Sequence, residues 1–157
     1  MLDAKGLKRI MKEINEHRTT KDRCYKLAFE ESNPQVFYAI VSGLDGVFTD
    51  GEYIMKIKLP DNYPFGAPVI CFETPNGKFI PGSNICLNIT HFHSETWSPL
   101  ITLEKLINSL ISLLGDKDVT RGNGFINTSN GDKKELAKAS KEYNKKHFSN
   151  IMSMNMI

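Results

Sequence analysis

Three cysteines carry the most reactive side chains of the chain, at positions 24, 71 and 86. A cysteine thiolate is a nucleophile that can hold an acyl group as a thioester. Cys71 lies in the apolar run Val69–Phe72, which is typical of a core strand, and Cys24 lies where another strand begins. We expect both to be buried, inert thiols. Cys86 lies in a segment without periodicity, and its position alone fits a nucleophile and a buried thiol equally.

Two histidines near Cys86, at positions 91 and 93, raise the alternatives of a zinc site and a cysteine–histidine dyad. Zinc requires three or four ligands at set spacing, and this part of the sequence has no Cys-x-x-Cys pair and no fourth ligand. A histidine five positions away on an irregular segment gives no special support for a dyad. We therefore predict no metal and no cofactor.

The elements that must position these residues follow from periodicity. Apolar residues at i, i+3, i+4 and i+7 predict an opening helix over Asp3–Glu16, with Leu7, Ile10, Met11 and Ile14 on its inner stripe. Short β-rich runs separated by turn residues predict four strands of an antiparallel meander. These strands are expected over residues 24–30, 36–41, 52–59 and 69–73.

The second half of the chain is predicted to be mainly helical. Residues 74–97 show no sustained period, and so long an irregular segment inside a compact domain is usually functional. A nearly all-apolar helix is predicted over 102–115, then a polar loop, then a last helix over 132–148 capped by Asp132. The fold class is therefore α+β, with the sheet covered on one face, in a single domain over residues 1–157.

Composition narrows the classes of function. Hydrophobic residues make up 40% and charged residues 24% of the chain, as in soluble globular proteins. The formal charge of +2 and the scattered basic residues do not indicate binding to nucleic acid or to an acidic membrane. The odd number of cysteines and the charged, amphipathic start predict a reducing compartment, the cytoplasm or the nucleus.

Four motifs together resemble the ubiquitin-conjugating enzymes over nearly the whole chain. Their order and spacing agree with that family, and none of them would suffice alone. They are Leu7–Ile10 with Lys12 and Glu13, Leu59–Phe65 leading to Pro68, Thr74-Pro75-Asn76 followed ten positions later by Cys86, and Thr96–Pro99 before the apolar helix.

One departure from the family pattern points to a subgroup. Thr74 stands where the family usually has histidine, and this threonine, the step to the cysteine and His93–Trp97 resemble a subgroup that is tail-anchored in the endoplasmic reticulum membrane. The ending Ser149–Ile157 is short and mixed in polarity, so we expect no direct membrane anchor in this chain.

The resemblance implies an acyl transferase of the ATP-dependent ubiquitination pathway, with Cys86 as the thioester carrier. Asn76 would donate its amide to the developing oxyanion or hold the loop that does so. Relatives have an acidic residue beyond the buried helix that positions the acceptor lysine, and here Asp116 and Asp118 are the nearby candidates. The subgroup is also associated with hydroxyl acceptors, so serine and threonine targets stay open.

The resemblance also implies partners: ubiquitin, its activating enzyme, a ubiquitin ligase and a protein substrate. The positions that match the ligase-binding residues of the family are Arg9, Phe65, Ser98 and Pro99. Asn108 takes the central place on the helix face that contacts donor ubiquitin, where relatives often have an apolar residue. Two alternatives remain at this point: a conjugating enzyme for another ubiquitin-like modifier, and an inactive variant that only binds ubiquitin or a ligase.

Overall fold

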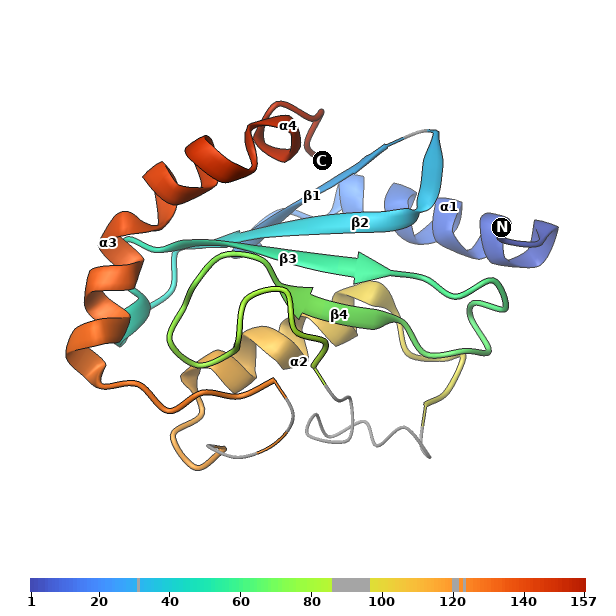
Figure 1. Cartoon of the computed structure of the whole chain (residues 1–157). Coiled ribbons are helices and arrows are strands. Elements are labelled where there is room, and N and C mark those ends of the chain that lie inside the picture. The colour runs from blue at the N-terminus through green and yellow to red at the C-terminus, as the bar shows by residue number, and fades with distance from the viewer. Residues whose placement is uncertain (31, 86–96, 120–121, 123) are drawn as a thin grey trace.

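Four strands form one antiparallel sheet in the order β1-β2-β3-β4 in the computed structural model of the chain (Figure 1). The structure describes residues 1–30, 32–85, 97–119, 122 and 124–157. The strands are β1 Tyr25–Glu30, β2 Asn33–Ser42, β3 Glu52–Lys58 and β4 Val69–Phe72. The helices are α1 Ala4–Thr19, the short 3-10 helix η1 Gly46–Phe48, α2 Leu103–Gly115, α3 Asn130–His147 and α4 Ser149–Met152. The predicted α+β class and the meander are confirmed.

The main core lies between one face of the sheet and the helices α1 and α2. Alternate residues of each strand point into it, as the period of two requires, and α2 crosses beneath β3 and β4 (Figure 1). Thr102 caps α2 by accepting a hydrogen bond from Lys105 N at 3.2 Å. The fully buried large side chains of this core include Phe37, Tyr53, Ile57, Tyr63 and Phe72.

The opposite face of the sheet is also partly covered, which the sequence did not predict. Ala28, Ile40 and Ile54 form a second buried cluster with Ile151 of α4, and α4 lies on the side of the sheet away from α2 (Figure 1). The last residues then pair with β1, because Leu27 and Ile157 exchange two main-chain hydrogen bonds of 2.9 Å. This pairing occupies hydrogen-bonding groups that the edge strand would otherwise leave open.

Two helix boundaries differ from the predicted ones. Asp3 caps α1 as expected, accepting from Gly6 N at 2.7 Å, but the helix continues to Thr19 instead of ending at Glu16. The N-cap of α3 is Ser129, which accepts from Asp132 N at 3.0 Å, so the helix begins earlier than predicted. A serine at this position satisfies one of the free N–H groups of the first turn as well as the predicted aspartate would.

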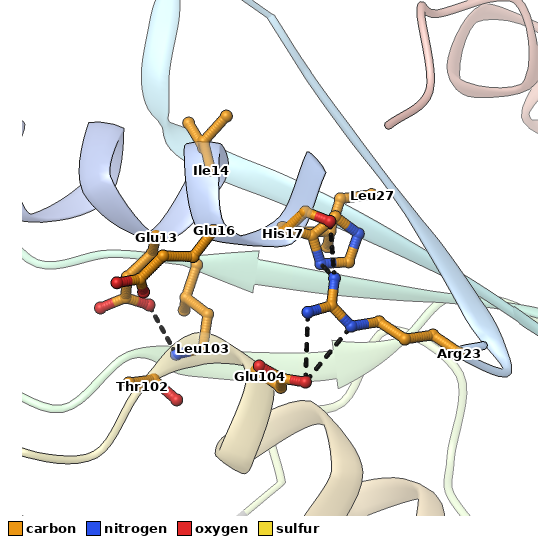
Figure 2. Close-up of a pocket in the computed structure, with 9 residues that line it drawn as sticks. All are labelled: Glu13, Ile14, Glu16, His17, Arg23, Leu27, Thr102, Leu103 and Glu104. Atoms are coloured by element: carbon orange, nitrogen blue, oxygen red, sulfur yellow. Dashed lines mark hydrogen bonds and ion pairs between the residues drawn. The ribbon is translucent and has the colours of Figure 1, made fainter. Parts of the chain in front are cut away.

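The inner face of α1 is more polar than its apolar stripe suggested. Glu13 and His17 are buried at 8% and 7% exposure, whereas Leu7 and Met11 are exposed at 42% and 45%. Glu13 ion-pairs with Arg9, accepts from the Tyr63 hydroxyl at 3.0 Å and accepts from Leu103 N at 2.7 Å. Figure 2 shows this last bond, from the first residue of α2 to the carboxylate on α1. One buried carboxylate thus joins α1, the loop before β4 and α2.

A second junction at the far end of α1 involves His17, Arg23 and Glu104 (Figure 2). Arg23 forms an ion pair with Glu104 at 3.2 Å and donates to Nδ1 of His17. The other ring nitrogen, Nε2, lies 3.2 Å from the main-chain oxygen of Ile157. A neutral ring with its hydrogen on Nε2 satisfies both contacts, because Nδ1 accepts while Nε2 donates. The ring therefore connects α1 to the C-terminal strand pairing.

The surroundings of His17 should make the protein less stable as pH falls. Burial and then the nearby Arg23 charge lower the pKa of His17 below its ordinary value, with Glu104 opposing them. As pH falls below about 6.5, His17 becomes protonated in the unfolded chain before it does so in the folded protein. The free energy of unfolding therefore decreases. Urea denaturation at about pH 7.5 and about pH 5.5 should show this loss. A His17→Gln variant should lose less stability over the same interval, and an equal loss would contradict the assignment.

Candidate active site

The chain leading into Cys86 is held against the edge of the sheet. Ile85 N donates to Ile70 O of β4 at 2.8 Å, and Gly82 N donates to Phe72 O at 2.8 Å. The Ile85 side chain is buried at 4% exposure. Cys86, like His91 and His93, lies outside the described residues, but its preceding neighbour is fixed by both backbone and side chain.

A second segment, residues 124–128, packs beside this approach to Cys86. A Cβ atom on Gly124 would lie 3.1 Å from Asn84 O, which explains why a glycine suits this position. Phe125 forms a β-bridge with Phe79, and their rings lie 4.6 Å apart. The segment that precedes α3 is therefore a wall beside the residues that lead to Cys86.

The Asn76 side chain is buried and forms three hydrogen bonds within its own turn. Its Oδ1 accepts from Lys78 N at 2.9 Å and from Phe79 N at 2.8 Å, and its Nδ2 donates to Thr74 O at 3.1 Å. Asn76 is 0% exposed. These bonds are those of an asparagine that shapes its own turn, as the Pro-Asn-Gly sequence suggests.

Thr74 anchors the same turn from the other side. Its Oγ1 accepts from Ile54 N at 2.9 Å and donates to Asn144 Oδ1 of α3. Gly77 follows with φ +80°, a conformation that favours glycine, and a Cβ there would lie 2.5 Å from Thr128 Oγ1. The threonine that replaces the usual histidine thus joins β3, the turn and α3 in one buried contact.

The other two cysteines differ in burial: Cys71 is buried, as the sequence predicted, whereas Cys24 is not fully buried. Cys71 is buried at 8% exposure, and burial together with Glu73 raises the pKa of its thiol to about 12. Such a thiol stays protonated and is a poor nucleophile. Cys24 is only partly buried. Among the described residues, no group of three or more His, Cys, Asp or Glu side chains could hold a metal ion.

The proposed ligase-binding positions converge at one end of the molecule. Trp97 Nε1 donates to Pro64 O at 2.9 Å, which brings Ser98 and Pro99 beside the loop that carries Phe65. Arg9 reaches the same region, because its Nη2 donates to Ile101 O at 3.2 Å. Phe65 is 66% exposed, so the prediction of an exposed aromatic is confirmed, while its role as an anchor stays a prediction.

Two features of this surface were missed by sequence reasoning. The Arg9 guanidinium is partly committed to Glu13, which leaves less of it for a partner. Leu7 and Met11, which were expected in the core, are exposed on the same helix, and Leu100 beside Pro99 is 81% exposed. The sequence feature that could have indicated the exposure of Leu100 is its position between Ser98-Pro99 and Thr102, the N-cap residue of α2.

The remaining predicted positions lie on or after α2. Asn108 is exposed on the helix, so it is accessible to a partner. Asp116 ends α2 and accepts from Asp118 N through its carboxylate at 2.9 Å, and Asp118 is exposed. Lys78 connects Asp116 to the turn that contains Asn76, because its ammonium group donates to Asp116 O and its N–H donates to Asn76 Oδ1.

The four-stranded meander, the Pro-Asn turn and the exposed aromatic loop agree with the class of protein that the motifs led us to expect. Comparison with protein families agrees: residues 9–152 match the ubiquitin-conjugating enzyme family. The chain therefore belongs to the ubiquitin-conjugating enzyme family.

The curated relatives carry names from the same family. A probable ubiquitin-conjugating enzyme E2 33 of Arabidopsis thaliana is 37% identical over 69% of this chain and 44% of its own length. Ubiquitin-conjugating enzyme E2 6 of Kluyveromyces lactis is 34% identical over 80% of this chain and 49% of its own length. The chain thus spans about half the length of these relatives.

A solved structure supports the fold. A crystal structure of a Plasmodium yoelii protein assigned to this enzyme class covers 96% of the chain with a TM-score of 0.62 and 23% identity. Relatives of the tail-anchored subgroup were expected from Thr74, and the similarity to the E2 6 proteins and to mouse E2 J2, which is 37% identical over 63% of the chain, agrees with this. Within the described part of the chain, no helix is both long and apolar enough to cross a membrane.

Proposed function

We propose that this chain is an active ubiquitin-conjugating enzyme that carries ubiquitin on Cys86. The observation that supports it best is the hydrogen bond from Ile85 to β4, which fixes the residue before Cys86 at the edge of the sheet. The raised pKa of the Cys71 thiol argues against that cysteine as the carrier. Together with family membership over residues 9–152, these contacts favour Cys86.

The proposed reaction has two acyl transfers. The Cys86 thiolate attacks the thioester carbonyl of ubiquitin on the activating enzyme, a new carbon–sulfur bond forms, and the activating-enzyme thiolate leaves. A substrate amine then attacks the Cys86 thioester, loses a proton, and expels the Cys86 thiolate. We propose lysine as the acceptor, with serine or threonine hydroxyl as a further acceptor class. Asp116 and Asp118 are the proposed acceptor-positioning residues.

A charging assay tests the proposal. The chain is incubated with activating enzyme, ATP and ubiquitin, and we expect a shift of one ubiquitin that a thiol reductant removes. A shift with a different ubiquitin-like protein and none with ubiquitin would favour the alternative modifier. If no modifier produces a shift, the proposal of an active enzyme is refuted, and the alternative of an inactive variant that only binds ubiquitin or a ligase is favoured.

The role of Asn76 is the next prediction. Because Asn76 is fully buried and three of its side-chain hydrogen bonds lie within the turn, we propose that it holds the loop and does not itself reach the oxyanion. Asn76→Ala leaves Lys78 N and Phe79 N without an acceptor, and should cost about 2 kcal/mol of stability. Charging should remain normal while discharge to free lysine slows on the order of 10²-fold, because the reacting groups are misplaced when the turn is not held.

An Asn76→Asp variant separates the two roles. The carboxylate keeps both acceptor contacts, but it replaces the donor to Thr74 O by an oxygen and adds a buried negative charge, so discharge should lie between that of the wild type and that of the alanine variant if Asn76 holds the turn. Discharge as slow as that of the alanine variant would instead indicate that the amide donor acts on the oxyanion. Circular dichroism melting of both variants serves as the control for folding.

The remaining assignments follow from the family. The proposed partners are ubiquitin, its activating enzyme, a ligase at the surface of Arg9, Phe65, Ser98 and Pro99, and a protein substrate. Asn108 would face donor ubiquitin. We infer a single conjugating domain over residues 1–157 that works in the cytoplasm or nucleus, where the pathway and reduced cysteines are found.

A further inference from the structure

Lys78 is a buried cation beside the proposed active site, and the mechanism above does not use it. The residue is 6% exposed. Its ammonium group donates to the main-chain oxygen of Asp116 and lies 3.4 Å from that of Leu114. Both oxygens belong to the C-terminal end of α2, where the last carbonyls of a helix lack partners within the helix.

The helix itself offers no substitute for this contact. The last turn of α2 contains no basic residue, although a cation there is favoured by the helix dipole. Lys78 supplies the charge from a segment 36 residues away from Leu114 along the chain. The partners of its ammonium are carbonyl oxygens of the main chain, so the contact fixes the path of the backbone at Asp116.

The backbone of Lys78 is bonded to two further parts of the site. Its N–H donates to Asn76 Oδ1 at 2.9 Å, and its carbonyl accepts from Ile126 N at 2.9 Å. One residue therefore contacts the Asn76 turn, the wall that lies beside the approach to Cys86, and the loop that begins at Asp116.

We propose that Lys78 is a positioning residue for the transfer step, which couples the Asn76 turn to the Asp116 loop so that the two sides of the site move together. This inference rests on the proposed function, and in particular on acceptor positioning by Asp116 and Asp118. The Asp116 carboxylate accepts from Asp118 N at 2.9 Å, so fixing the Asp116 backbone also orients Asp118. Burial lowers the pKa of Lys78, and Lys133 lowers it further, whereas Asp116 opposes them.

The test compares Lys78→Met with Lys78→Arg, and uses Lys141→Met, an exposed lysine of α3, as the matched control. Each protein is first charged with ubiquitin, and discharge to free lysine is then followed at saturating lysine. We expect Lys78→Met to charge like the wild type but to discharge roughly tenfold to a hundredfold more slowly, since small misplacements of reacting groups cost that much. Lys78→Arg should recover most of the rate, and Lys141→Met should match the wild type.

Three outcomes of the discharge assay would overturn the proposal: discharge of Lys78→Met within about twofold of the wild type, a parallel loss of charging and discharge, or a folded Lys78→Arg as slow as Lys78→Met. Hydrogen–deuterium exchange gives a readout independent of activity. Amides of residues 115–118 should exchange faster in Lys78→Met than in the wild type, and unchanged exchange would refute the coupling. If the wild type is not charged at all, the proposed function fails, while the exchange data still decide whether Lys78 joins the two loops.

Discussion

Replacing Cys86 by serine is expected to abolish the thioester and to leave an ester that thiol reductants do not remove. A serine hydroxyl can accept the same acyl group, but an oxygen ester is a far less reactive donor toward amines than a thioester. Transfer to lysine should therefore fall by at least about 10³-fold. The measurement is gel mobility of the charged protein with and without reductant, followed by discharge to free lysine.

Cys71→Ser is the matched control for this experiment. Cys71 is buried in β4, burial and Glu73 raise the pKa of its thiol to about 12, and its Sγ donates to Glu73 Oε1 at 3.6 Å. A serine hydroxyl of similar size can make the same bond, so charging should be unchanged. Loss of charging in a folded Cys71→Ser protein would show that the carrier has been assigned to the wrong cysteine.

Replacing Glu13 by alanine should cause the largest loss of stability among these variants. It leaves Leu103 N, the Tyr63 hydroxyl and the Arg9 guanidinium without their shared acceptor. Bonds to a buried carboxylate are worth more than neutral ones, and breaking a buried ion pair costs about 3–5 kcal/mol. Because the Arg9 side chain is 23% exposed and partly hydrated, we expect the lower end, about 3 kcal/mol. The midpoint of thermal unfolding should fall by roughly 6–12 °C.

Glu16→Ala on the same helix provides the comparison. Glu16 pairs with Lys12 at 3.7 Å with side-chain exposures of 59% and 72%, and exposed pairs of this kind contribute roughly 0.5 kcal/mol or less. The two variants remove the same group from α1, so their difference isolates the buried contacts. Equal destabilisation by both substitutions would show that Glu13 does not hold α2 to α1.

The kinds of elements could be predicted from local patterns, while Cys86 as the carrier stays a prediction. Short β-rich runs separated by turn residues predicted four strands in the right order, and a nearly continuous apolar run predicted α2, because residue type and burial follow the period of each element. The Pro-Asn-Gly turn was recognisable for the same local reason. The boundary errors at α1 and α3 arose where several polar residues could cap or extend a helix equally well.

Contacts with residues far along the chain determine which side of a helix or strand is buried. Leu7 and Met11 fit the apolar stripe but are exposed, whereas Glu13 and His17 are buried beside Ile10 and Ile14. The partners of Glu13 and His17 include Leu103 and Ile157, which lie 90 and 140 positions along the chain. The covering of the outer sheet face by Ile151 likewise depends on where the chain turns after α3. Periodicity cannot show such pairings, since it reports only the neighbours along one element.

The sequence by itself determined that this chain has the motifs of a ubiquitin-conjugating enzyme, and it predicts Cys86 as the thioester carrier. The tertiary structure decided how the turn ahead of Cys86 is held: Asn76 hydrogen-bonds within its own turn, and Lys78 joins this turn to the end of α2. The physical reason is that a buried polar group is stable only with a partner. For Lys78 that partner lies on an element which only folding brings near.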